Sequence, residues 1–169
     1  KDRPFALYME AGLLDGSLNL SGLPLTKLEL RHGDGKQSVR FDAPNPQHIE
    51  ELDVVASGGR LEMHGLGNAS FTRLKVEGSK TDCLFDFSGA IRRPAQGKIT
   101  IPQGVVEIHI PAAMAAHIML ESLCGTLNLE GPLTRKGGEF WTQAALECRA
   151  PVLTLKVTVL EGALRLRSA

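Results

Sequence analysis

The side chains of this sequence that could do chemistry are carboxylates recurring between apolar residues. They are Glu29, Asp53, Glu62, Glu77, Asp86 and Glu107. Where apolar and polar residues alternate, such carboxylates point away from the buried face of a strand. On stacked strands they could line up, hold calcium and cleave an acidic polysaccharide. Basic residues are interspersed among them, namely Lys27, Arg60, Lys75 and Arg165. A solvated strand face needs this mixture in any case, so polysaccharide cleavage is only a remote alternative.

No sequence motif supports a catalytic, cofactor or metal site. The chain lacks a Gly-x-Ser-x-Gly elbow, a P-loop, a His-Glu-x-x-His pair and an EF-hand. Its 5 histidines include no His-x-His or i, i+4 pair, and His109 stands beside Glu107 as a solvated strand residue would. We therefore predict a chain that is not an enzyme, with no catalytic residue, no cofactor and no bound metal.

The 3 cysteines, Cys83, Cys124 and Cys148, include no Cys-x-x-Cys pair. This argues against a zinc site or a thioredoxin-type site. The simplest interpretation is that they are small buried hydrophobic residues. The spacing allows a Cys124–Cys148 disulfide but does not establish it.

Composition limits the class of protein. The chain has 169 residues, with 19 basic and 19 acidic side chains, so it lacks the positive charge of a nucleic-acid binder or a membrane-surface binder. Hydrophobic residues make up 43%, enough for a core, and 18 glycines indicate a turn-rich, all-β fold. The sequence begins at Lys1 without an initiator methionine, and we expect a processed or trimmed piece.

A repeat of about 22 residues runs along the chain. Segments spaced apolar-x-x-apolar-x-apolar are followed by shorter alternating segments, most of them introduced by glycine. The shorter segments close with Leu20, Phe41, Met63, Phe87, Ile108, Leu129 and Leu166. Consecutive members of this series lie 21 to 24 residues apart, except the last two, which lie 37 apart. Gly16–Leu20 and Gly125–Leu129 are nearly the same pentapeptide, GSLNL and GTLNL.

These units predict a single-domain, all-β parallel β-solenoid over residues 1–169, with about six to seven rungs. One unit cannot bury its inner face alone, and glycine allows the tight corner between its two strands. A leucine-rich repeat would need an Asn or Cys ladder after the strand, which this sequence lacks. A β-sandwich remains an alternative, although it would not explain the constant period.

Two segments fall outside the repeat. Residues 1–14 are expected to form an N-terminal cap or extension, and residues 131–148 an insertion or cap loop. The insertion holds a candidate partner-binding loop, formed by Arg135, Lys136, Phe140 and Trp141. The alternative is that its two aromatic residues plug the end of the solenoid. Residues 111–123 are rich in alanine, but their place in the repeat predicts a corner followed by a strand.

The final segment of the chain is predicted to be an exposed assembly edge. It stops only three residues after Leu166, and a solenoid end exposes unpaired strand groups that must be covered or paired. The candidate assembly residues are Val157, Val159, Leu164 and Leu166.

Several of these segments resemble a known family. They are residues 23–30 (LPLTKLEL), 65–78 (GLGNASFTRLKVEG) and 84–89 (LFDFSG), the last with an Asp-Phe-x-Gly corner. They are similar to the toast-rack domain, a bacterial parallel β-solenoid of adhesins and of cell-wall-active antibiotics response proteins. The match covers about residues 14–130 and, more loosely, continues to 166. The resemblance implies an extracytoplasmic or membrane-attached module without catalytic residues.

The leading hypothesis is therefore a non-enzymatic structural or interaction module of the bacterial cell envelope, adhesin-like or associated with envelope stress. The expected partner is another protein or a second copy, met through the solenoid ends. A carbohydrate- or cell-wall-binding module is the alternative, and a sensory domain coupled to a kinase or an anti-sigma partner is a third. We expect an extracytoplasmic location, no nucleic-acid partner, and membrane contact only through a segment absent from this chain.

Overall fold

The computed structural model describes residues 3–13, 15–147 and 152–169 and confirms the all-β parallel solenoid. The strands are β1 (Phe5–Ala11), β2 (Gly16–Asn19), β3 (Leu25–His32), β4 (Lys36–Arg40), β5 (Ile49–Ala56), β6 (Arg60–His64), β7 (Phe71–Gly78), β8 (Asp82–Asp86), β9 (Ala95–Ile110), β10 (Ala116–Glu130), β11 (Leu133–Lys136), β12 (Glu139–Thr142) and β13 (Leu153–Ser168). Two short helices accompany them in the described residues, α1 (Leu66–Ala69) and α2 (Gln143–Glu147).

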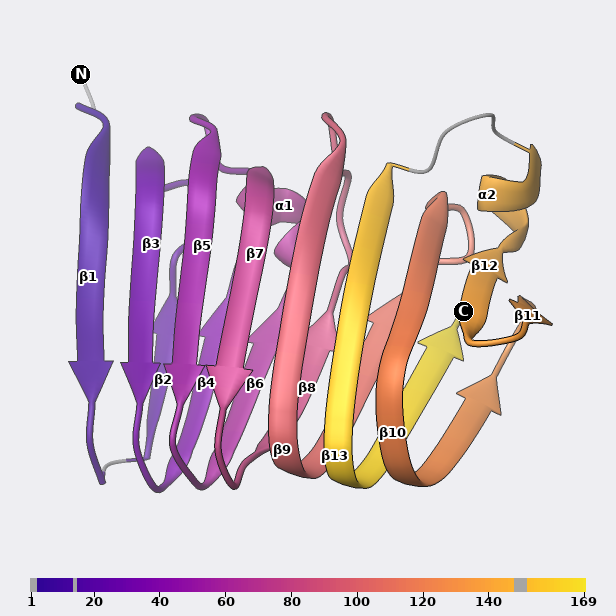
Figure 1. Ribbon diagram of the computed structural model, residues 1–169. Helices are drawn as coiled ribbons and strands as arrows, with labels where there is room; N and C mark the ends of the chain where they lie inside the picture. The colour runs from indigo at the N-terminus through magenta and orange to yellow at the C-terminus, as the bar shows by residue number, and fades with distance from the viewer. Residues whose placement is uncertain (1–2, 14, 148–151) are drawn as a thin grey trace.

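The strands form one sheet that folds back on itself into two layers (Figure 1). The front layer holds β1, β3, β5 and β7 and the first halves of β9, β13 and β10, all parallel. The back layer holds β2, β4, β6 and β8 and the second halves of the same three long strands. The described strands thus make seven rungs, each with a front and a back segment.

The last two rungs are not in sequence order. The chain leaves β9, forms the outer strand β10 and the hairpin β11–β12, and then returns to insert β13 between β9 and β10. The C-terminal strand is therefore paired on both sides. The prediction that Val157, Val159, Leu164 and Leu166 form an assembly edge is wrong, because all four side chains are buried in the core.

Inward side chains stack from rung to rung, as the alternation predicts. One front row runs Leu28, Leu52, Leu74, Gly97, Leu155 and Ile118 in register. One back row contains Cys83, whose burial raises the pKa of its thiol to about 12 and leaves it as a core residue. Cys148, the other half of the disulfide considered with Cys124, lies outside the described residues.

Glycines align at the corners between the layers of the three long rungs. Gly104, Gly162 and Gly125 are in register, and each has a φ between +138° and +149°. A Cβ on Gly162 would overlap the carbonyl oxygen of Gly104, and one on Gly125 would overlap that of Gly162. Only glycine accepts both the backbone angle and the close stacking of the corners, which accounts for part of the glycine excess.

The prediction of a corner followed by a strand at residues 111–123 is confirmed, although these residues are rich in alanine. Residues 116–123 are strand, the first part of β10. They are held by parallel pairing with β13 and by antiparallel pairing of His117–Met119 with β12. Pairing on both sides outweighs the helix preference of alanine.

Among the described elements, no helix has the length and apolar character needed to span a membrane.

Candidate functional site

The hairpin β11–β12 lies against one end of the solenoid, on the front half of β10 (Figure 1). It carries the four residues predicted as a partner-binding loop. Phe140 is completely buried, so it cannot serve as the predicted partner contact. The Trp141 ring is half-buried and stacks on His117, with 3.6 Å between ring centroids. Arg135 and Lys136 are exposed, and the Arg135 guanidinium lies 5.7 Å from the Phe140 ring centroid.

Thr142 anchors this hairpin to the rung that it covers. Its fully buried hydroxyl donates to the Met114 carbonyl over 2.7 Å and accepts from the Ala116 N–H over 3.0 Å. Two backbone groups beside the start of β10 thereby find partners on a side where the described strands form no further parallel rung. The hairpin thus acts as a cover for half of this end. The second half of β10, from Gly125 on, has no strand on its outer side within the described residues.

The opposite end, formed by β1 and β2, is open across both layers of the described structure. Its inward side chains Leu7, Met9 and Leu18 are only half-buried, whereas their equivalents in the next rung are buried. Leu18 belongs to the pentapeptide GSLNL, and Leu127 of the related GTLNL is half-buried at the other end. The two similar pentapeptides are therefore the back segments of the first and last rungs.

The outward carboxylates are divided between two faces. Glu29, Asp53 and Glu77 lie on the front layer, and Glu62, Asp86 and Glu107 lie on the back layer. They do not form the single line that polysaccharide cleavage would need. Across the described ranges, no three His, Cys, Asp or Glu side chains gather as a metal site requires.

Three basic side chains of the back layer surround Glu62. Arg60 donates to it over 2.7 Å, His64 Nε2 lies 3.4 Å away and Lys36 Nζ 3.9 Å away. The hydrogen bond from Arg60 lowers the pKa of Glu62, partial burial opposes this shift, and His64 and Lys36 add to it. On the same layer His109 bonds Glu107 over 2.7 Å, in the outward position that the alternation predicts.

Because the pKa of Glu62 is lowered by folding, this group stabilises the protein above about pH 4.3, the ordinary value for glutamate. That contribution is lost as the pH falls through the lower pKa of the folded state. We expect Glu62→Gln to be less stable than the wild type at about pH 6, with the difference shrinking toward about pH 3. Urea unfolding at several pH values measures this. Glu50→Gln, at an exposed carboxylate of β5, is the control, and parallel pH profiles for Glu62→Gln and wild type would contradict the assignment.

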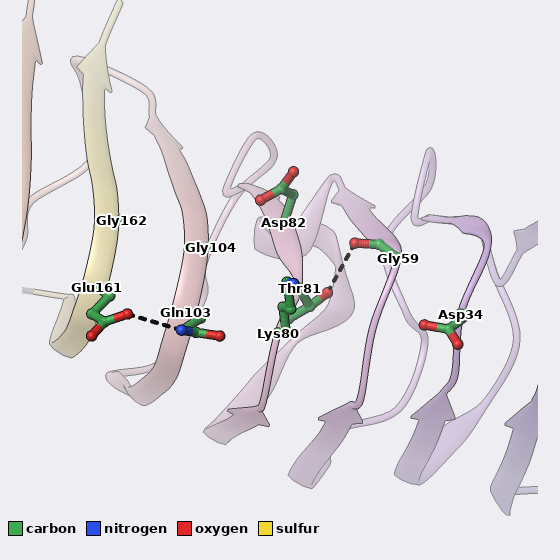
Figure 2. Close-up of a pocket in the computed structure, with 9 residues that line it drawn as sticks. All are labelled: Asp34, Gly59, Lys80, Thr81, Asp82, Gln103, Gly104, Glu161 and Gly162. Atoms are coloured by element: carbon green, nitrogen blue, oxygen red, sulfur yellow. Dashed lines mark hydrogen bonds between the residues drawn. The ribbon is translucent and has the colours of Figure 1, made fainter.

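A groove of about 720 Å³ crosses the corners of successive rungs, and Figure 2 shows the side chains that line it. Four of its polar side chains, those of Thr81, Asp82, Gln103 and Glu161, are bonded within the protein. Asp82 Oδ1 accepts from the Val105 N–H over 2.9 Å, and Gln103 donates to Glu161 over 2.8 Å. The Thr81 hydroxyl donates to the Gly58 carbonyl over 3.0 Å. These bonds tie neighbouring rungs together, so the groove has a structural role.

A second groove, of about 520 Å³, lies on the outer face of the front layer. It brings together four exposed basic residues, Arg73, Lys75, Lys98 and Lys156, named the basic strip below. Of these, only Lys75 is among the basic residues named from the sequence. The available signal is a lysine between core positions in three units, as in Leu74-Lys75-Val76, Gly97-Lys98-Ile99 and Leu155-Lys156-Val157. Only the strand register shows that these lysines are neighbours.

Comparison with known proteins gives a structural likeness only. No family model matches the chain, and no curated protein matches it. A crystal structure of a "putative cell adhesion protein" from Clostridium sporogenes superposes with a TM-score of 0.58 at 14% identity. The likeness covers 79% of this chain and 56% of the adhesion protein, so this chain spans little more than half the length of that protein. It supports the fold expected from the toast-rack resemblance, while membership of that family stays a prediction.

Proposed function

We propose that this chain is a non-enzymatic interaction module of the bacterial cell envelope, adhesin-like in its role, which binds through the open first rung of its solenoid. The observation that carries the proposal is the outer side of β1 and β2, with which no strand of the described residues pairs. Unpaired strand groups bordered by partly exposed apolar side chains are a template for pairing with another strand. Phe5, Tyr8 and Leu13 add exposed apolar surface around this end.

The partner proposed for this end is a second copy of the chain. The hairpin β11–β12 occupies the front half of the opposite end, where the next front strand of an incoming copy would have to pair. Head-to-tail stacking into a filament is therefore obstructed. Pairing of one first rung with another uses only the end that is open in both layers. It gives a closed dimer.

The adhesin-like role and the surface location draw support from the fold likeness to the cell adhesion protein. A non-enzymatic role is supported by the local bonding of polar groups in the corner groove and around Glu62. A link to envelope stress rests on the toast-rack resemblance alone.

The experiment is sedimentation velocity over a range of concentrations, with two matched variants. Leu18→Lys and Leu127→Lys place the same charge at corresponding half-buried positions of the first and last rungs. We expect the wild type to dimerise, Leu18→Lys to weaken dimerisation roughly tenfold or more, and Leu127→Lys to leave it unchanged.

Each remaining outcome rejects the proposal in a distinct way. A wild type that stays monomeric at every concentration removes self-association through the ends. Equal loss in both variants indicates head-to-tail stacking, and loss in Leu127→Lys alone places the contact at β10. Circular dichroism spectra identical to wild type are required of both variants.

A further inference from the structure

We propose that the basic strip on the outer face of the front layer binds a carboxylated polysaccharide. This inference rests on the proposed function, because the cell envelope is where the protein would meet such a polysaccharide. The site itself is independent of the solenoid ends. The two proposals therefore fail in different experiments.

The basic strip is built by strand register. Lys75 pairs with Lys98 and Lys98 pairs with Lys156, so three ammonium groups stand on adjacent strands. Adjacent strands are about 4.8 Å apart, which gives a regular row of positive charge about 10 Å long. Arg73 stands beside this row, two residues before Lys75 on β7. Earlier in the same row stand Tyr8, Glu29 and Asp53, so positive charge begins only at Lys75.

Much of this charge has no partner within the described protein. Lys75 bonds Glu77 over 3.2 Å, but no described carboxylate forms an ion pair with Arg73, Lys98 or Lys156. Glu51 on β5 also lines the groove, directly opposite Arg73 in register, so the unpaired charge is concentrated at Lys98 and Lys156. Like charges on directly opposed strand positions repel one another, so the arrangement costs stability. An anionic ligand across the strip relieves that repulsion.

The lining of the groove favours a sugar polymer over an acidic peptide. Gln96 and Thr154 offer an amide and a hydroxyl to sugar hydroxyl groups, and Met119 gives the groove an apolar border. The strands below are paired on both sides, so they leave no backbone ladder for a peptide to join. A row of evenly spaced cations fits a polymer with one carboxylate in each repeating sugar.

The test measures binding of the whole chain to polygalacturonate, with neutral dextran and poly-L-glutamate as comparison polymers. We expect binding to polygalacturonate at about 20 mM salt that weakens strongly at about 500 mM, and no binding to dextran. The double variant Lys98→Gln/Lys156→Gln should bind roughly tenfold more weakly, since it loses two exposed ion pairs. The matched control Lys27→Gln/Lys36→Gln removes the same charge outside the groove and should bind like the wild type.

The outcomes that overturn the inference are separate from those for dimerisation. Absence of polygalacturonate binding at low salt rejects the site. Equal weakening in the two double variants shows attraction by overall charge rather than a site. Binding of poly-L-glutamate as tight as that of polygalacturonate assigns the strip to acidic peptides instead. Circular dichroism spectra identical to that of the wild type are required of both double variants.

Discussion

Val157→Asp should destabilise the protein by roughly 4 kcal/mol or more. Val157 is completely buried and stands in register between Ile99 on β9 and Leu120 on β10. A carboxylate there would lose its hydration without gaining a partner. The total stability of a domain is only about 5–15 kcal/mol, so a large part of it would be lost. Urea unfolding followed by circular dichroism measures the loss.

The neighbouring residue on the same strand supplies the control. Lys156 points to solvent, and Lys156→Gln should change the free energy of unfolding by no more than about 0.5 kcal/mol. The two variants also distinguish a core strand from an assembly edge. If Val157→Asp gave a stable monomer that had only lost self-association, β13 would be an edge after all, and the strand order described above would be incorrect.

The sequence predicts the rung correctly because the rung is set locally. Alternation at period two decides which side chains point inward, as in Leu74-Lys75-Val76, and the corner glycines mark where each strand pair turns. These features need no knowledge of distant contacts. The period of about 22 residues follows from them, and with it the number of rungs.

The order of the last two rungs could not be predicted in the same way. β10 and β13 carry the same inward pattern, so either could pair with β9. Once the structure is known, the exposure of the two strands explains their order. The inward residues of β13 are almost all buried, whereas β10 is mostly exposed from Glu121 on, a stretch that includes Ser122 and Cys124. Polar residues along a strand are typical of an edge. β13 is the last strand in the sequence, and this position wrongly suggested that it is also the outermost strand of the solenoid.

The basic strip could not be predicted from the sequence for a related reason. Lys98 and Lys156 are adjacent in space, but the whole of β10 and the hairpin separates them along the chain. Trp141 and Phe140 suggested a binding loop because aromatic residues often anchor interfaces. The structure instead uses Phe140 in the core and stacks Trp141 on His117, since the end of a solenoid has apolar surface to cover.

Gly162→Ala should destabilise the protein by about 3 kcal/mol or more. Gly162 has a φ of +144°, which a residue with a Cβ adopts only with strain of about 1–3 kcal/mol. A Cβ at this position also overlaps the backbone carbonyl of Gly104, which cannot give way because its own rung is packed on both sides. Strain and overlap act together at a corner that has a neighbouring rung on each side. Urea unfolding measures the change.

Two other glycines separate the two contributions. Gly137 in the hairpin turn has a φ of +61° but open space around a Cβ, so Gly137→Ala should cost only about 1–2 kcal/mol. Gly16 at the start of β2 has neither a positive φ nor a close neighbour, and Gly16→Ala should be within about 0.5 kcal/mol of wild type. The order Gly162, Gly137, Gly16 is the expected result. If Gly162→Ala were no more costly than Gly137→Ala, corner stacking would contribute nothing, and the close approach of neighbouring corners would not explain the aligned glycines.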